Sequence, residues 1–139
     1  TPDDLAHFQA AGAALAKQYD AYCPFPGVCL NGTQVLSENI ADVAGLAAAH
    51  DAYVLSLNGQ PDAVKRGLTG EQRFFISFAQ SWRQKDREAS LKQQILTDGH
   101  SPDEYRGDTV RNLDAWYKAF DIKPGDKQYL DPKDRVQVW

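Results

Sequence analysis

The sequence has 139 residues, of which 42% are hydrophobic and 24% are charged, and its formal net charge is −4. This ordinary globular balance allows one compact domain with a buried core and argues against disorder. The interspersed charges exclude nucleic acid and anionic lipid as partners, and no apolar run approaches the roughly 20 residues of a membrane helix.

The first predicted helix covers residues 2–22. Pro2 suits a first helical turn, and Asp3 and Asp4 favour the N-terminal end of the helix dipole. Cys23-Pro24 ends this helix. The apolar residues that recur at helical spacing are Leu5, Phe8, Leu15 and Tyr19.

Cys23 and Cys29 bracket a turn rich in proline and glycine. The turn could bring the two thiols together as a disulfide in an oxidising compartment, and two unlinked thiols are the equal alternative. The Asn31-Gly32 dipeptide then lies between short extended flanks, which predicts a short hairpin near residues 28–36.

A long second helix follows from Ser37, which suits the N-cap position. Its apolar residues form one broad face and Asn58-Gly59 ends it, after about 30 Å of helix. After a loop at 61–70, residues 71–84 predict another helix. That helix is apolar nearly all round, so we expect it to be buried.

The last third of the chain predicts shorter elements. These are a charged helix at about 87–97, a helical turn after Pro102, a helix at about 110–120 and an extended end at 135–139. No repeat, low-complexity run or linker interrupts the order. The sequence therefore predicts one mainly α-helical unit.

Histidines and cysteines do not provide a complete zinc site. The three histidines are His7, His50 and His100, and no two of them have the i, i+4 spacing that places both imidazoles on one helical face. The two cysteines do not supply the missing ligands. Any metal site must be completed by residues outside this chain.

Glu38 and Asp42 stand four residues apart at the start of the second helix, so both carboxylates project to one side. Taken alone, this pattern is more typical of solvated first-turn acids that complement the helix dipole. Asp98 and His100 lie in a loop between helices, where Asp98 could orient the imidazole. In isolation, a helix cap beside an exposed histidine explains that loop as well.

Taken together, several motifs in one order resemble the neprilysin and endothelin-converting-enzyme family of zinc metallopeptidases. The resemblance covers nearly the entire chain, from Asn31-Gly32 to the end. Its motifs are Glu38-Asn39-Ile40-Ala41-Asp42 with Gly45-Leu46 and Ala52-Tyr53, the helix from Gln72 to Trp82, the segment from Asp98 to Pro102 with Arg106, and then Asn112, Phe120 and Trp139.

The resemblance implies the C-terminal helical part of a thermolysin-like, or gluzincin, catalytic domain that spans residues 1–139. One zinc ion would be held by Glu38 and by two histidines of an H-E-x-x-H helix, which leaves an open catalytic site. Asp42 would accept a hydrogen bond from a ligand imidazole and fix its tautomer.

By the same resemblance, His100 donates a hydrogen bond to the oxyanion that develops on the scissile carbonyl, with Asp98 as its support. Arg106 holds a backbone carbonyl of the substrate. Trp82 helps to line the apolar pocket for the side chain that follows the cut bond.

The sequence departs from the family pattern in two respects. Arg83 and Val138 stand where vertebrate members have cysteines, so the chain resembles a bacterial member. The H-E-x-x-H motif, whose glutamate is the general base, is absent and would lie upstream of Thr1. We expect the segment alone to be inactive.

Three hypotheses follow. The leading one is part of an extracytoplasmic zinc metalloendopeptidase that hydrolyses oligopeptides and that needs the N-terminal remainder of the same protein as its partner. The alternative is a catalytically silent helical binding module derived from the peptidase fold. The third is a proteolytic product that stays docked to its complementary fragment.

Overall fold

The computed structural model describes residues 1–138, so Trp139, the last residue of the predicted extended end, lies outside the described residues. The mainly α-helical prediction is confirmed, and residues 1–138 contain no β-strand. The elements are α1 (Pro2–Asp20), α2 (Leu36–Ser56), α3 (Gly70–Ser81), α4 (Glu88–Thr97), α5 (Asp103–Gly107), η1 (Asp108–Asn112), α6 (Asp114–Phe120) and η2 (Pro132–Asp134).

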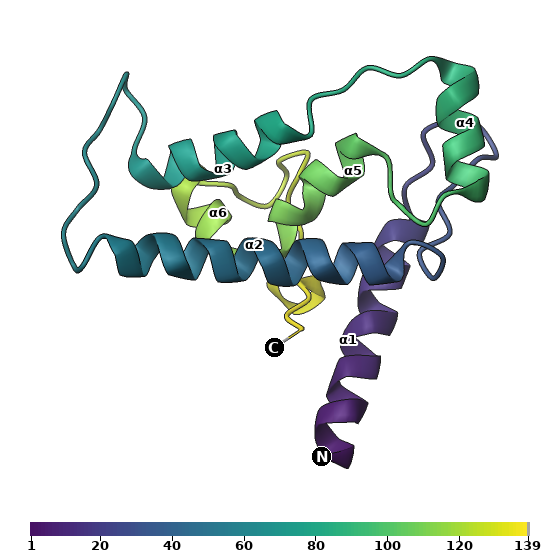
Figure 1. Cartoon of the computed structure of the whole chain (residues 1–139), viewed down its shortest axis with the longest axis horizontal. Helices are drawn as coiled ribbons and strands as arrows, with labels where there is room; N and C mark the ends of the chain where they lie inside the picture. The colour runs from purple at the N-terminus through teal and green to yellow at the C-terminus, as the bar shows by residue number, and fades with distance from the viewer. Residues whose placement is uncertain (139) are drawn as a thin grey trace.

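Helix α2 runs along most of the molecule, and the other elements are arranged around it (Figure 1). Helix α3 lies along the same direction on one side, with α6 packed against it, and η1 packs on α2. The C-terminal part of α1 packs near the start of α2, and the N-terminal part of α1 points away from the other helices. None of the described helices is both long and apolar enough to cross a membrane.

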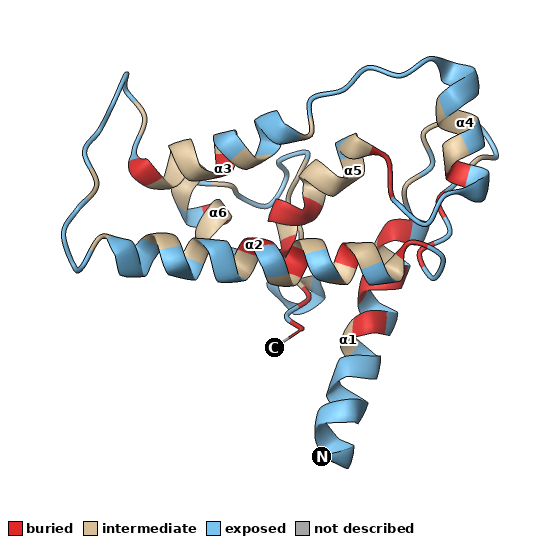
Figure 2. Ribbon diagram, viewed as in Figure 1, coloured by how far each residue is buried: buried red, intermediate tan, exposed pale blue. Residues whose placement is uncertain are grey.

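Two hydrophobic cores meet along α2. Val43 belongs to the first core, which includes Leu15 and Tyr19 of α1 and Val136 near the C-terminus. One helical turn later, Leu46 belongs to the second core, with Phe75 of α3. Because α2 contributes to both cores, its N-terminal half is held between them, whereas its C-terminal turns are mostly exposed (Figure 2).

The segment that leads into α2 differs from the predicted hairpin. Residues 32–35 form a turn, Leu36 already belongs to α2, and Val28 takes part in an isolated antiparallel bridge with Phe25. The Asn31 side chain accepts hydrogen bonds from the backbone N–H groups of Thr33 and Gln34. This side-chain turn replaces the strand pairing that a hairpin requires.

Gly32 explains why the chain turns here. Its backbone lies so close to α1 that a Cβ atom would stand 1.9 Å from the carbonyl oxygen of Ala16. Its N–H group donates to the Asp20 carboxylate at 2.7 Å. Helix α2 then starts at Leu36 after Val35, which makes no side-chain cap hydrogen bond, so the prediction of Ser37 as N-cap was wrong.

Cys23 and Cys29 form a disulfide, which decides between the two alternatives that the sequence left open. The bond closes the turn between α1 and Leu30, and the Leu30 N–H group donates to the Tyr22 carbonyl at 2.9 Å. The connection into α2 is thus fixed both covalently and by backbone hydrogen bonding.

Helix α3 is less buried than its sequence predicted. Of its 12 residues only Gly70 and Phe75 are buried, because α6 and the side chains of His50 and Tyr53 on α2 cover one side and the residues of the last turn are exposed. It starts at Gly70, where Thr69 and Gln72 form a capping box, and it ends at Ser81.

The helix predicted at 110–120 is divided in two. Leu113 adopts an extended conformation between η1 and α6, with φ −107° and ψ 116°. The buried Asn112 side chain lies next to this break and makes long-range hydrogen bonds. Its Oδ1 accepts from the Val136 backbone N–H at 2.8 Å and from the Gln18 side chain at 2.9 Å. Asn112 therefore ties the C-terminal end to α1.

Candidate active site

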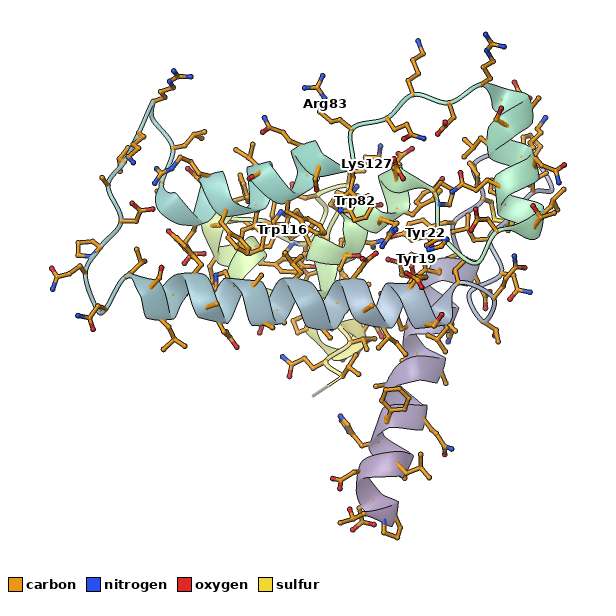
Figure 3. All side chains as sticks on the ribbon, in the orientation of Figure 1. Tyr19, Tyr22, Trp82, Arg83, Trp116 and Lys127 are labelled. Atoms are coloured by element: carbon orange, nitrogen blue, oxygen red, sulfur yellow. A yellow bond between two sulfur atoms is a disulfide. The ribbon has the colours of Figure 1, made fainter. Side chains whose placement is uncertain are left out.

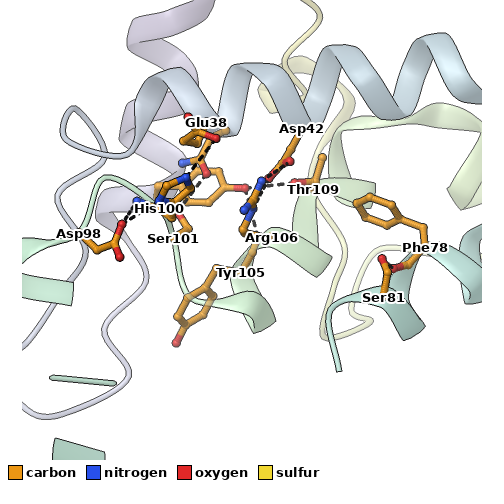
Figure 4. A network of polar contacts seen from close by, with 12 residues as sticks. Glu38, Asp42, Phe78, Ser81, Asp98, His100, Ser101, Tyr105, Arg106 and Thr109 are labelled. Atoms are coloured by element: carbon orange, nitrogen blue, oxygen red, sulfur yellow. Dashed lines mark hydrogen bonds and ion pairs between the residues drawn. The ribbon is translucent and has the colours of Figure 1, made fainter. Parts of the chain in front are cut away.

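The structure brings all six candidate site residues into one region. Figure 4 shows five of them together, and Trp82 packs against Arg106. They come from four segments, of which only the loop after α4 and helix α5 are neighbours in sequence. Glu38 and Asp42 lie in the first turns of α2, Asp98 and His100 in the loop after α4, Arg106 in α5, and Trp82 at the end of α3.

Glu38 and His100 face each other across the gap between α2 and the loop. The distance from Glu38 Oε2 to His100 Nε2 is 3.4 Å, which is longer than a strong charge-assisted hydrogen bond. Their side chains are 40% and 51% exposed. Both groups are therefore accessible to a ligand.

Asp98 fixes the other side of the imidazole ring. Its Oδ1 lies 2.8 Å from His100 Nδ1 and accepts a hydrogen bond from the His100 backbone N–H at 2.9 Å. The hydrogen bond from the His100 ring is the main reason that the pKa of the Asp98 carboxyl lies below its usual range. An ionised Asp98 requires the proton on Nδ1, so Nε2 is the atom that faces Glu38.

Asp42 and Arg106 form a two-pronged ion pair that is mostly buried. Arg106 Nε donates to Asp42 Oδ2 at 2.7 Å, and Arg106 Nη2 donates to Asp42 Oδ1 at 2.8 Å. The side chains are 10% and 17% exposed, and the hydrogen bonds to Asp42 raise the pKa of the Arg106 guanidinium. Two of the five N–H donors of Arg106 are used by Asp42, which leaves three for other acceptors.

Trp82 lies against Arg106 on the side of α3. The guanidinium carbon is 4.1 Å from the centre of the indole ring, which is a favourable cation–π geometry. The Trp82 Nε1 atom is buried and has no hydrogen-bond partner within residues 1–138. Asp42 and Trp82 together hold the guanidinium in one orientation.

An open groove of about 640 Å³ runs between α2 and α3 and includes Asp42 in its wall. Phe74 and Phe78 of α3 make part of its apolar lining, and Leu46 of α2 lines the opposite side. The groove thus connects the acidic start of α2 with an apolar surface.

Two residues near the site were not identified from the sequence. Asn39 is completely buried, and its Oδ1 accepts a hydrogen bond from the buried Ser101 hydroxyl at 2.9 Å. A signal was present, because Asn39 precedes Val43 by four residues and Leu46 by seven, which places it on the apolar face of α2. A polar residue on such a face must find a buried partner.

The donor set can provide only part of a metal site. Within residues 1–138, no group of three or more histidine, cysteine, aspartate or glutamate side chains is arranged to hold a metal ion. The Glu38 carboxylate is accessible and is not tightly hydrogen-bonded to His100, and carboxylate oxygen is one of the common zinc donors.

The chain is similar to one family model and to several known proteins. The family model described as peptidase family M13 matches residues 1–136. The chain is 36% identical over 140 residues to a neutral endopeptidase of Lactobacillus helveticus, covering 100% of this chain and 20% of that protein. It is 35% identical over 140 residues to Neprilysin-3 of Drosophila melanogaster, covering 97% of this chain and 17% of that protein.

Solved structures show the same fold. The zinc metalloprotease Zmp1 of Mycobacterium tuberculosis in its open state superposes with a TM-score of 0.95 at 46% identity, over 100% of this chain and 23% of that chain. PepO from Lactobacillus rhamnosis gives a TM-score of 0.80 at 35% identity, over 100% of this chain and 21% of that chain. The chain thus spans about a fifth of the length of these proteins.

Proposed function

Because the chain belongs to peptidase family M13, we propose that it forms the C-terminal part of the active site of a zinc-dependent metalloendopeptidase and supplies Glu38 as the third zinc ligand. The observation that carries this proposal is the approach of Glu38 to His100 at 3.4 Å. Two accessible side chains from distant segments converge there, beside the Asp42–Arg106 pair.

The other two zinc ligands would be histidines of an H-E-x-x-H helix in the part of the protein outside this chain. When bound, zinc polarises the substrate carbonyl and makes water nucleophilic at neutral pH. Glu38 suits one position of such a site, since carboxylate oxygen is a common zinc donor. The N-terminal remainder of the protein is therefore the required partner.

His100 would stabilise the negative charge that develops on the scissile carbonyl oxygen. Asp98 holds the proton on Nδ1, so a protonated imidazole presents Nε2–H toward the Glu38 side of the site. A preorganised donor of this kind contributes on the order of 100-fold or more to the rate. Asp98 supports the role by holding the ring in the orientation that points Nε2 toward the Glu38 side of the site.

Arg106 would bind a backbone carbonyl of the substrate with donors that Asp42 leaves free. Asp42 has lone pairs beyond the two that Arg106 uses, so it can also accept from a ligand imidazole and fix its tautomer. Trp82 keeps the guanidinium in place and would line the pocket for the neighbouring substrate side chain.

Oligopeptides are the substrates that we propose, because a backbone-binding arginine and an oxyanion donor recognise the peptide group itself. The Cys23–Cys29 disulfide supports an extracytoplasmic location, since disulfides persist in oxidising compartments.

The test is to measure zinc content and peptidase turnover in the full-length protein and its Glu38→Gln variant. We expect Glu38→Gln to lose most of its zinc and its activity, because an amide oxygen is a much weaker ligand than a carboxylate. The control is Asp51→Asn, which neutralises an exposed acid on the same helix and should change neither quantity.

Full zinc occupancy with unchanged turnover in Glu38→Gln would refute Glu38 as a ligand. A full-length wild-type protein with neither zinc nor activity would instead support a silent binding module.

A further inference from the structure

A buried hydrogen bond lies one residue along the chain from both Glu38 and His100. The Ser101 hydroxyl donates to Asn39 Oδ1 at 2.9 Å, and the two residues are 1% and 0% exposed. Asn39 follows Glu38, and Ser101 follows His100. The bond therefore joins the two backbone segments that carry the facing side chains.

The contact between Glu38 and His100 is not sufficient to hold these two side chains at a fixed distance. Both side chains are about half exposed, and their 3.4 Å contact is too long to hold two mobile groups in one geometry. Asp98 fixes the imidazole ring relative to its own loop. It does not fix the loop relative to α2, so another contact must do so.

One side-chain hydrogen bond connects that loop to the first turn of α2, and another connects it to the turn just before α2. One is the Asn39–Ser101 bond, and the other runs from Gln34 Nε2 to the Asp98 carbonyl at 2.7 Å. The Gln34 bond is exposed to water, whereas the Asn39–Ser101 bond is fully buried. Water competes with the first bond and not with the second, so the second restricts the loop more.

The polar character of the buried pair matters for this restriction. Apolar contacts have no directionality, so an apolar pair would tolerate small shifts of the loop along α2. A buried hydrogen bond has a preferred distance and angle, and breaking it leaves both polar atoms unsatisfied. The pair therefore favours one register of the loop on α2.

We infer that Asn39 and Ser101 are positioning residues that set the spacing between the proposed zinc ligand Glu38 and the proposed oxyanion donor His100. The inference rests on the function proposed above for those two side chains. Displacement of a catalytic group by about 1 Å can lower a rate on the order of 100-fold. A hydrogen bond one residue from each group is well placed to prevent such a displacement.

The first test is Ser101→Ala in the full-length zinc-loaded protein. We expect kcat to fall roughly 10-fold to 100-fold, which is the range for residues that orient groups at a metal site. KM and zinc content should change little, because Glu38, Arg106 and Trp82 stay in place. Ser101→Cys is a second variant, since it keeps the size of the side chain with a weaker donor, and its kcat should be intermediate.

The matched control is Tyr117→Phe, which removes another buried hydroxyl far from the site. The Tyr117 hydroxyl donates to the Arg111 carbonyl at 2.8 Å and accepts from the Leu130 N–H at 3.0 Å. This variant should lose thermal stability and keep kcat. If Tyr117→Phe lowers kcat as much as Ser101→Ala does, the effect is general destabilisation and the inference is wrong.

The decisive measurement combines Ser101→Ala with His100→Gln. If Ser101 acts through His100, the double variant has the kcat of His100→Gln alone, whereas an independent structural role makes the two losses multiply. Multiplying losses, or a fully active Ser101→Ala, overturn the positioning role and leave the proposed function intact. A fully active His100→Gln overturns the proposed role of His100, and the inference fails with it.

Discussion

Arg106 depends on Asp42 for the placement of its charge. Two hydrogen bonds hold a guanidinium that is 17% exposed, and Trp82 covers one of its faces. The same geometry that could present donors to a substrate therefore also contributes to the stability of the fold. The substrate-binding role proposed for Arg106 and the stability of the fold therefore depend on the same contacts.

Asp42→Asn should destabilise the chain by about 2–3 kcal/mol, because it leaves a mostly buried positive charge without its partner. The measurement is urea-induced unfolding of the 139-residue chain. The control is Glu88→Gln, which breaks the exposed Glu88–Lys92 pair on α4 and should change stability by less than about 0.5 kcal/mol. Equal effects of the two substitutions would contradict the importance of the buried pair.

Gly32 is required for the close approach of the α1–α2 connection to α1. Gly32→Ala should destabilise the chain by about 2 kcal/mol or more, because the new Cβ would overlap the Ala16 carbonyl and force the backbone to move. Gly45→Ala on α2 is the matched control. Nothing lies within 4 Å of its added Cβ, and alanine stabilises a helix interior by about 0.5–1 kcal/mol relative to glycine.

Thermal unfolding followed by circular dichroism checks both glycine variants. The melting temperature should fall for Gly32→Ala and rise for Gly45→Ala. Two shifts of the same sign would count against the steric explanation.

At the scale of elements, the loop between α2 and α3 is held by one charged cluster. Asp62 Oδ2 accepts hydrogen bonds from the Tyr53 hydroxyl at 3.0 Å and from Arg73 Nη2 at 2.6 Å. Arg73 also donates to the carbonyls of Ala63 and Leu68. The loop is thereby attached to both flanking helices.

This cluster predicts a pH dependence of stability. The hydrogen bond from Tyr53 is the main cause that lowers the pKa of the Asp62 carboxyl from its ordinary value. A lowered pKa means that the unfolded chain binds the proton more tightly, so Asp62 stabilises the fold at neutral pH and this contribution is lost as the pH falls through the folded-state pKa. Asp62→Asn should therefore lower the melting temperature at pH 7.

The difference between Asp62→Asn and the wild-type chain should shrink on acidification, since both carry a neutral side chain at low pH. Melting temperatures of the two proteins at neutral and strongly acidic pH provide the check. A difference that does not change with pH would show that Asp62 acts by packing alone.

The disulfide fixes the other connection, between α1 and α2. Its two cysteines are six positions apart, so the closed loop is short and the expected stabilisation is about 2 kcal/mol. Replacing both cysteines with serine should lower the melting temperature accordingly, as measured by calorimetry. Unchanged melting after this replacement would mean that backbone hydrogen bonds alone keep the turn in place.

At the scale of the whole molecule, the chain spans about a fifth of the length of the proteins that it matches. With no three-ligand group within residues 1–138, the isolated chain should bind zinc weakly and hydrolyse no peptide. Calorimetric titration with zinc and a fluorogenic peptide assay test these expectations. Peptide hydrolysis by the isolated chain that a chelator abolishes would contradict them.

The exposed side of α3 is consistent with a chain that is part of a longer protein. Its aromatic residues predict burial, yet only Gly70 and Phe75 are buried in the chain by itself. Figure 3 shows side chains of α3 on the side away from α2 without another helix over them. The relatives are about five times longer than this chain, so the remaining length is available to cover that side.

Much of this protein could be predicted from its sequence. Helical periodicity located the main helices within a few residues, because an apolar stripe at 3.6-residue spacing is a local signal. The order of short motifs indicated the family, which the match over residues 1–136 confirms. The sequence also shows that no two of its three histidines have the i, i+4 spacing of a zinc-binding helix, since a count of histidines and their spacing needs no structure.

Only the tertiary structure decided how distant segments meet. The contact between Glu38 and His100, the Asp42–Arg106 pair and the buried Asn39–Ser101 bond join positions more than 60 residues apart. The predictions of a hairpin near residues 28–36 and of an unbroken helix at 110–120 were wrong because contacts with distant segments decide both conformations. Gly32 packs on α1 and Asn112 binds the C-terminal end, and long-range contacts of this kind override the local preference of a dipeptide or a helical stripe.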